Sequence, residues 1–121
     1  MVRAQHIFVT KRLDETLLIM PQSETAGFSD ADLQRALQKV LKQLDKPGVE
    51  NLVVDLGGKN YFGSAMIGAI FQLRMQARQT GGRAALCNAS EEMLDVLRIL
   101  KMGSEWPYFA SRDEALASIE A

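Results

Sequence analysis

The segment 51–82, NLVVDLGGKNYFGSAMIGAIFQLRMQARQTGG, decides the fold of this chain. Its apolar run at residues 52–56 is typical of a strand that is covered on both faces, and Gly57 and Gly58 allow a sharp turn after it. A helix follows from Ser64 to about Thr80, with a pair of glycines as its C-terminal cap. Residues 83–103, RAALCNASEEMLDVLRILKMG, predict another strand and helix. The two segments together predict a strand, helix, strand unit with a parallel strand pair.

The sequence before this unit predicts a hairpin and a helix. Residues 6–10 (HIFVT) and 16–20 (TLLIM) have the composition of two antiparallel strands, separated by the polar KRLDE, and Pro21 ends the second strand. Ser29 is a favoured N-cap for the first helix, and apolar residues recur after it at helical spacing until Pro47 stops the run.

The sequence after the unit predicts one short strand and two capped helices. Ser90 caps the helix that follows residues 83–87, and an extended piece is expected around Tyr108 and Phe109. Ser111 begins a Ser-x-x-Glu capping box for a last helix, which has apolar residues available to dock on the body. The chain is therefore predicted to be one α/β domain over residues 1–121.

Composition and charge exclude several functions. The chain has 121 residues, of which 14 are basic and 15 acidic, with no block of like charges, so neither nucleic-acid binding nor a polybasic membrane anchor is predicted. Its apolar runs are far shorter than the ~20 residues of a membrane span, and we expect a cytoplasmic protein without direct membrane insertion. The lone Cys87 and His6 indicate no disulfide framework and no metal site, and the glycines around Lys59 match no nucleotide-binding pattern. No cofactor is predicted.

The residues of the strand, turn and helix start also carry a family resemblance. The run 53–70, VVDLGGKNYFGSAMIGAI, with the segment 74–103 after it, resembles the STAS domain, the fold of bacterial anti-sigma factor antagonists. Asp55 matches an aspartate that ends the family's strand, and 63–68 match its Asp-Ser-Ser-Gly-Leu-Gly turn, so Ser64 falls on the family's phosphorylatable serine. Gly63 stands where the family has aspartate, and Met66 where it usually has glycine. The hairpin half lacks the family's Gly-Glu-Leu-Asp run.

The resemblance implies a mixed sheet of four or five strands with about four helices, and a regulatory role in signal transduction and transcription. It implies no catalytic residue and a protein partner, an anti-sigma factor or a serine kinase, with release of that partner on phosphorylation of Ser64. The docking surface that it implies is the turn and helix start: Tyr61, Phe62, Gly63, Ser64, Met66 and Ile67.

Each of these residues also has a purely structural interpretation. Ser64 can be only a helix cap, and Asp55 can hold the turn with Gly57 and Gly58 by accepting backbone amides. Members of the set Tyr61, Phe62 and Met66 can point into the core. Arg74 and Arg78 lie four residues apart on the helix and are expected on a solvated face. Trp106 is expected to pack against the sheet, and Cys87 to be a small buried side chain.

Two other functions stay open at this point. STAS-like modules also occur as accessory subunits of membrane transporters, and the sequence does not exclude that role. Asp55, Lys59 and Ser64 could instead form an acid, base and nucleophile at one edge of the sheet, in a small enzyme or a ligand-binding protein.

Overall fold

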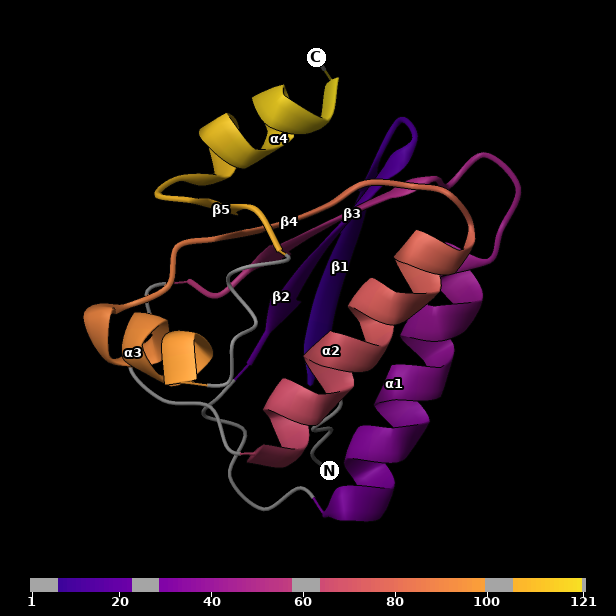
Figure 1. The fold of residues 1–121 in the computed structure, drawn as a ribbon. Helices are drawn as coiled ribbons and strands as arrows, with labels where there is room; N and C mark the ends of the chain where they lie inside the picture. Colours follow the sequence, from indigo (N-terminus) through magenta and orange to yellow (C-terminus); the bar gives the residue numbers. More distant parts are fainter. Residues whose placement is uncertain (1–6, 23–28, 58–63, 100–105, 121) are drawn as a thin grey trace.

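A mixed five-stranded sheet with four helices forms the fold in the computed structural model, which describes residues 7–22, 29–57, 64–99 and 106–120 (Figure 1). The prediction of an α/β domain with four or five strands is thus confirmed. The elements in chain order are β1 (Phe8–Leu13), β2 (Thr16–Pro21), α1 (Asp30–Leu44), β3 (Asn51–Asp55), α2 (Ser64–Gln79), β4 (Ala84–Cys87), α3 (Glu91–Ile99), β5 (Tyr108–Phe109) and α4 (Arg112–Glu120).

The strands lie side by side in their sequence order, from β1 to β5. The predicted hairpin is confirmed, because β1 and β2 pair antiparallel, and every later neighbouring pair is parallel. One detail of the prediction was wrong. The polar segment 11–15 is not a loop, since β1 continues to Leu13 and only Asp14 and Glu15 form the turn. Lys11 and Arg12 can belong to the strand although they are charged, because both are exposed and β1 lies at the edge of the sheet.

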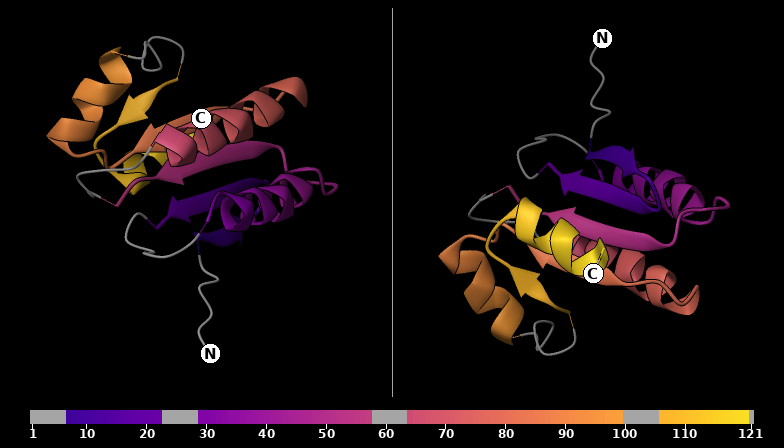
Figure 2. Two further views of the ribbon diagram at one scale, coloured as in Figure 1. Left: turned by 90° about the horizontal axis from the view of Figure 1, so that it is seen from below. Right: turned by 90° about the horizontal axis from the view of Figure 1, so that it is seen from above.

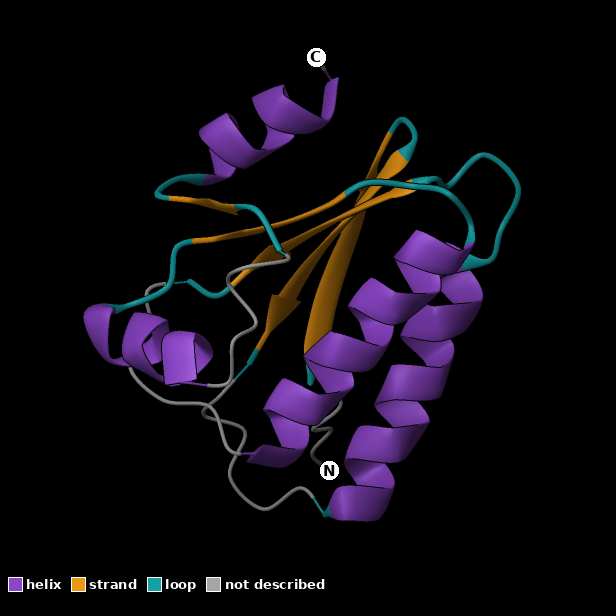
Figure 3. Ribbon diagram, viewed as in Figure 1, coloured by secondary structure: helices purple, strands orange, loops and turns teal. Residues whose placement is uncertain are grey.

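Helices cover both faces of the sheet (Figures 2 and 3). The main core combines buried residues of α1, α2 and α3 with Leu52 and Val54 of β3. The second, smaller core lies under α4 and contains Val53 together with Ala115 and Ile119. Successive side chains of β3 therefore pack into the two cores in turn. This confirms that β3 is buried on both faces, as its apolar run predicts. Every helix in the described part of the chain is too short or too polar to span a bilayer.

The helix ends follow the predicted capping signals. The hydroxyl oxygens of Ser29, Ser90 and Ser111 each accept a hydrogen bond from the backbone amide three residues later, at the starts of α1, α3 and α4. At the end of α2, the Gly81 amide donates to the Arg78 carbonyl and the Gly82 amide to the Ala77 carbonyl, the paired bonds of a Schellman cap.

Candidate functional site

The candidate site lies at the carboxyl edge of the parallel strands. Here β3 ends at Asp55, and the chain leaves the sheet for the start of α2 at Ser64. This edge is where open α/β sheets commonly bind their ligands, because the loops leave the strands there. A hollow of about 430 Å³ lies beside Asp55 and is lined by Gly57, Asn88 and Arg112 together with Met20, Pro21 and Gln22.

Asp55 organises this edge through both of its carboxylate oxygens. Its Oδ1 accepts hydrogen bonds from the Gly57 amide at 2.8 Å and from Asn88 Nδ2 at 2.9 Å. Its Oδ2 accepts a hydrogen bond from Arg112 Nε at 2.9 Å, and this forms an ion pair between β3 and the first residue of α4. The bond to Gly57 is the contact that a turn-forming aspartate makes.

The environment of Asp55 favours its ionised form. The side chain is only 3% exposed, and burial by itself would raise the pKa of the carboxyl group. The hydrogen bonds from Asn88, Gly57 and Arg112, together with the charge of Arg112, outweigh burial and lower this pKa below its ordinary value. Asp55 therefore acts as a fixed anion that ties the strand end, the following turn and α4 together. A carboxylate held in this way is poorly suited to exchange protons with a substrate.

Two members of this network were missed from the sequence. Asn88 has a φ of 59°, a left-handed conformation that asparagine tolerates better than most residues, and this turns its amide toward Asp55. A signal existed for it, because the carboxyl ends of parallel strands share one edge and Asp55 pairs with Cys87. Arg112 had no comparable signal, since its place depends on how α4 docks across the sheet.

Ser64 is the first residue of α2, as predicted. Met66 is 4% exposed and belongs to the main core, so it is not a surface contact and takes the inward orientation that was the structural alternative for it. Ile67 is half-buried, and Ala65 and Gly68 are exposed on the same first turns. The side chain of Ser64 lies outside the described part of the chain, as do the predicted turn residues Gly58, Lys59, Tyr61, Phe62 and Gly63.

The start of α2 differs electrostatically from the other helix starts. The first turns of α1, α3 and α4 each contain two acidic residues, whereas the first turn of α2 contains none. Acidic side chains in a first turn complement the positive end of the helix dipole. The amino end of α2 therefore lacks the negative charge that its three counterparts have.

Three further residues were singled out from the sequence, and burial decides the role of each. Arg74 is not on a solvated face as expected: it is 4% exposed, and its guanidinium carbon lies 5.7 Å from the ring centroid of the buried Trp106. Trp106 has the predicted packing role, because it belongs to the main core. Cys87 is fully buried, and burial raises the pKa of its thiol to about 12, so it is not a ready nucleophile.

Comparison with known proteins identifies the family. The sequence model of the STAS domain matches residues 8–115, and the chain therefore belongs to the STAS domain family. The protein named "Putative anti-sigma factor antagonist BtrV" of Bordetella bronchiseptica is 28% identical over 92 residues, which are 76% of this chain and 78% of that protein. The resemblance to this family that the sequence suggested is thus confirmed.

Solved structures show the same fold. An anti-sigma-factor antagonist (STAS) domain protein from Planctomyces limnophilus matches with a TM-score of 0.79 at 18% identity, over 94% of this chain and 98% of that one. The anti-sigma factor antagonist SpoIIAA in its unphosphorylated form matches with a TM-score of 0.76 at 17% identity, over 93% and 96%. The Bacillus cell fate determinant SpoIIAA in its phosphorylated form matches with a TM-score of 0.68 at 17% identity, over 93% and 98%.

Proposed function

We propose that this chain is a regulatory protein-interaction module that docks a protein partner through the turn and helix start around Ser64. Its partner is an anti-sigma factor or a serine kinase of that system, and its place of action is the cytoplasm. Membership of the STAS family and similarity to anti-sigma factor antagonists support this proposal. The observation that carries it is the position of Ser64 as the first residue of α2, at the carboxyl edge of the sheet.

The proposed docking surface begins with Tyr61, Phe62 and Gly63 and continues into α2. Met66 supports this surface from beneath, because its side chain is buried in the main core. Exposed Ala65 and Gly68 and half-buried Ile67 are small or apolar, so a partner could approach the helix closely here. The network around Asp55 holds the strand end from which the turn departs.

Phosphorylation of Ser64 is the proposed switch. A phosphate adds about −1.5 to −2 charge at neutral pH, and the amino end of a helix stabilises such a charge through its dipole and free amides. The first turn of α2 has no acidic residue that would repel it. A partner surface that is complementary to the uncharged serine would instead lose affinity through repulsion and desolvation. The fold is kept while the complex is broken.

The direct test is partner affinity. We would purify the partner that co-purifies with this chain from its native cell and measure its dissociation constant for wild type, Ser64→Ala and Ser64→Asp. Wild type and Ser64→Ala should bind within about threefold of each other, and Ser64→Asp at least about tenfold more weakly, because it places an unpaired charge in the interface. The matched control is Ser111→Asp at the start of α4, which should bind like wild type.

Equal binding by all three forms of residue 64 would refute the docking surface. Mass spectrometry of the peptide that contains Ser64, from cells in which the partner is free or bound, tests the switch separately. The phosphorylated peptide should be enriched in the pool of this protein that is not bound to the partner.

A further inference from the structure

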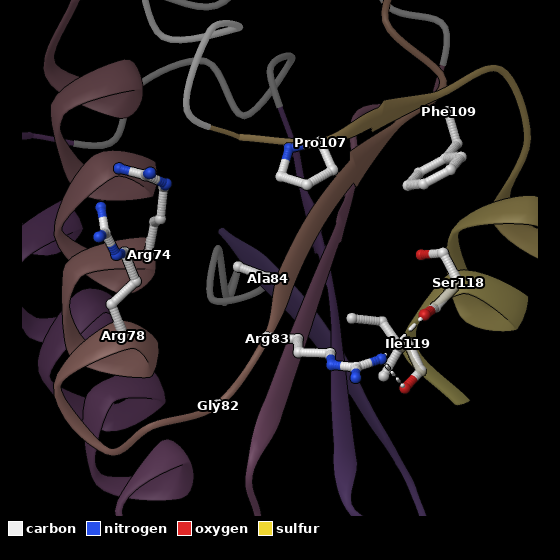
Figure 4. A pocket seen from close by; sticks show the side chains of 9 residues that line it. All are labelled: Arg74, Arg78, Gly82, Arg83, Ala84, Pro107, Phe109, Ser118 and Ile119. Atoms are coloured by element: carbon white, nitrogen blue, oxygen red, sulfur yellow. Dashed lines mark hydrogen bonds between the residues drawn. The ribbon is translucent and has the colours of Figure 1, made fainter. Parts of the chain in front are cut away.

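We propose that a second site on this domain, away from Ser64, binds a small organic anion. The site is a hollow of about 700 Å³ between the carboxyl half of α2, the start of β4 and α4 (Figure 4). Arg74 and Arg78 reach it from α2 on one side, and Arg83 lies across from them beside Ile119 of α4. This proposal goes beyond the docking function and does not depend on it.

Three arginines line the hollow, and two of them come from α2. The whole chain has a formal net charge of −1, yet the described residues that line the hollow include three arginines and no carboxylate. Cationic groups that share one concave surface reinforce each other's potential, because the protein beside them has a low dielectric constant. A phosphate or carboxylate that binds here would accept hydrogen bonds from these guanidinium groups in exchange for some of the contacts that they already make.

Two of the arginines are held in place by contacts with the protein. Arg74 is 4% exposed, with its guanidinium over the rings of Trp106 and Phe71 at 5.7 Å and 6.0 Å. Arg83 Nη1 donates to the carbonyl oxygens of Ser118 and Ile119, both at 3.3 Å, in the last turn of α4. Arg74, Arg78 and Arg83 all have further interactions within the protein, so an anion would share or exchange these contacts. A guanidinium has five N–H donors and can serve more than one acceptor.

The other walls of the hollow are apolar and indicate the rest of the ligand. Pro107 and Phe109 line one end, and Ala84 and Ile119 line the floor and the α4 side. Apolar side chains that line a pocket bind the apolar part of a ligand, such as a ring or a short hydrocarbon chain. The volume lies within the usual range for small-molecule sites, roughly 300–1,000 Å³. The chemical class that fits is a phosphate or carboxylate carried on an apolar body.

The site is separate from the proposed docking surface. Arg74 lies ten residues after Ser64 on the same helix, which corresponds to about 15 Å along the helix axis. Bound anion and bound partner would therefore occupy different parts of α2. Binding can be measured on the whole chain without any partner present.

The test is a titration followed by the backbone amide NMR signals of the full chain. The probes are phenyl phosphate and phenylacetate, which carry the two kinds of anionic group on the same ring, and benzyl alcohol as the uncharged analogue. At least one anion should cause saturable shifts at Gly82, Ala84 and Phe109, and benzyl alcohol should cause none. The anion with the lower dissociation constant shows whether the site prefers a phosphate or a carboxylate.

Two variants make the test specific. Arg78→Gln removes one charge from the exposed side of the hollow and should weaken binding about fivefold or more, because a charge-assisted hydrogen bond is lost. The matched control is Arg98→Gln, an exposed helical arginine on α3 that does not line the hollow, and it should bind like wild type. The proposal is overturned if neither anion saturates, if benzyl alcohol binds equally well, or if the two variants bind alike.

Discussion

The two ends of helix α2 are held in different ways. At its carboxyl end, the Schellman bonds of Gly81 and Gly82 fix the backbone, and Arg74 is buried against Trp106. A Cβ added at Gly82 would lie 1.5 Å from the Glu50 carbonyl oxygen, so the chain that leads to β3 touches the helix end directly. At the amino end, a Cβ added at Gly68 would meet nothing within 4 Å.

This difference shows how one helix can serve both the core and a surface. The carboxyl end is fixed by backbone contacts that no rotamer change can relieve, and it sets the helix against the sheet. The amino end is exposed on one side at Ala65 and Gly68 while Met66 holds it to the core from beneath. A surface that a partner can cover, on a rigid support, is the arrangement that binding sites commonly have.

The largest expected effect comes from Gly82→Ala. The new Cβ cannot be accommodated unless the backbone at Glu50 or Gly82 moves, because the atoms that it would strike are themselves backbone. We expect the free energy of unfolding to fall by at least about 3 kcal/mol, through strain and loss of the helix cap. Urea unfolding of the purified chain measures this change.

The matched control for this variant is Gly68→Ala on the same helix. Here the methyl group has open space, and alanine restricts the unfolded chain more than glycine does, so stability should rise by roughly 0.5–1 kcal/mol. If the two alanine variants changed stability alike, the contrast between the two ends of α2 would be wrong.

A smaller effect is expected from Arg112→Ala at the strand end before α2. The Asp55 carboxylate would lose one of its three hydrogen-bond donors, and we expect the free energy of unfolding to fall by roughly 1–3 kcal/mol at neutral pH, as for a buried hydrogen bond to a charged group. The exposed pair of Arg98 and Asp95 is the control, and Arg98→Ala should cost less than about 0.5 kcal/mol.

The effect of Arg112→Ala on stability should depend on pH. The folded-state pKa of Asp55 is lowered, so this carboxylate stabilises the fold above its unfolded pKa of about 4, and the stabilisation is lost as the pH falls through the folded pKa. Arg112→Ala brings that pKa closer to the unfolded value. The stability difference between wild type and variant should therefore narrow from pH 7 to about pH 3. A difference that stayed constant over this range would show that Arg112 acts through packing alone.

The fold could be predicted because its signals are local. Residues 52–56 are apolar on both faces, serines stand before three of the helices, and Gly81 with Gly82 ends α2, and each pattern depends only on neighbours in sequence. Arg74 was assigned to solvent because of its charge. Its spacing indicated otherwise, since it lies four residues after Ile70 and three before Ala77, both of them buried.

The candidate site could be predicted only in part. Asp55 and Ser64 stand at the junctions of strand, turn and helix, so their positions follow from the element order. The partners of Asp55 come from distant parts of the chain: Asn88 lies 33 residues away and Arg112 lies 57. Their meeting depends on sheet order and on the docking of α4, which local patterns do not determine.

The smallest expected effect tests the amino end of α2 by itself. Ser64→Asp places a negative charge in a first turn that has none, and the helix dipole should stabilise it by roughly 0.3–1 kcal/mol. Ser64→Asn, similar in size and uncharged, should lack this gain, and about 1 M salt should remove it from the aspartate variant. Urea unfolding in low and high salt measures both. A loss of stability for both variants would contradict the expected gain from a negative charge at the amino end of α2. A gain for aspartate alone would show that the fold tolerates a charge at Ser64, so that the proposed loss of partner affinity in Ser64→Asp could be assigned to the docking surface.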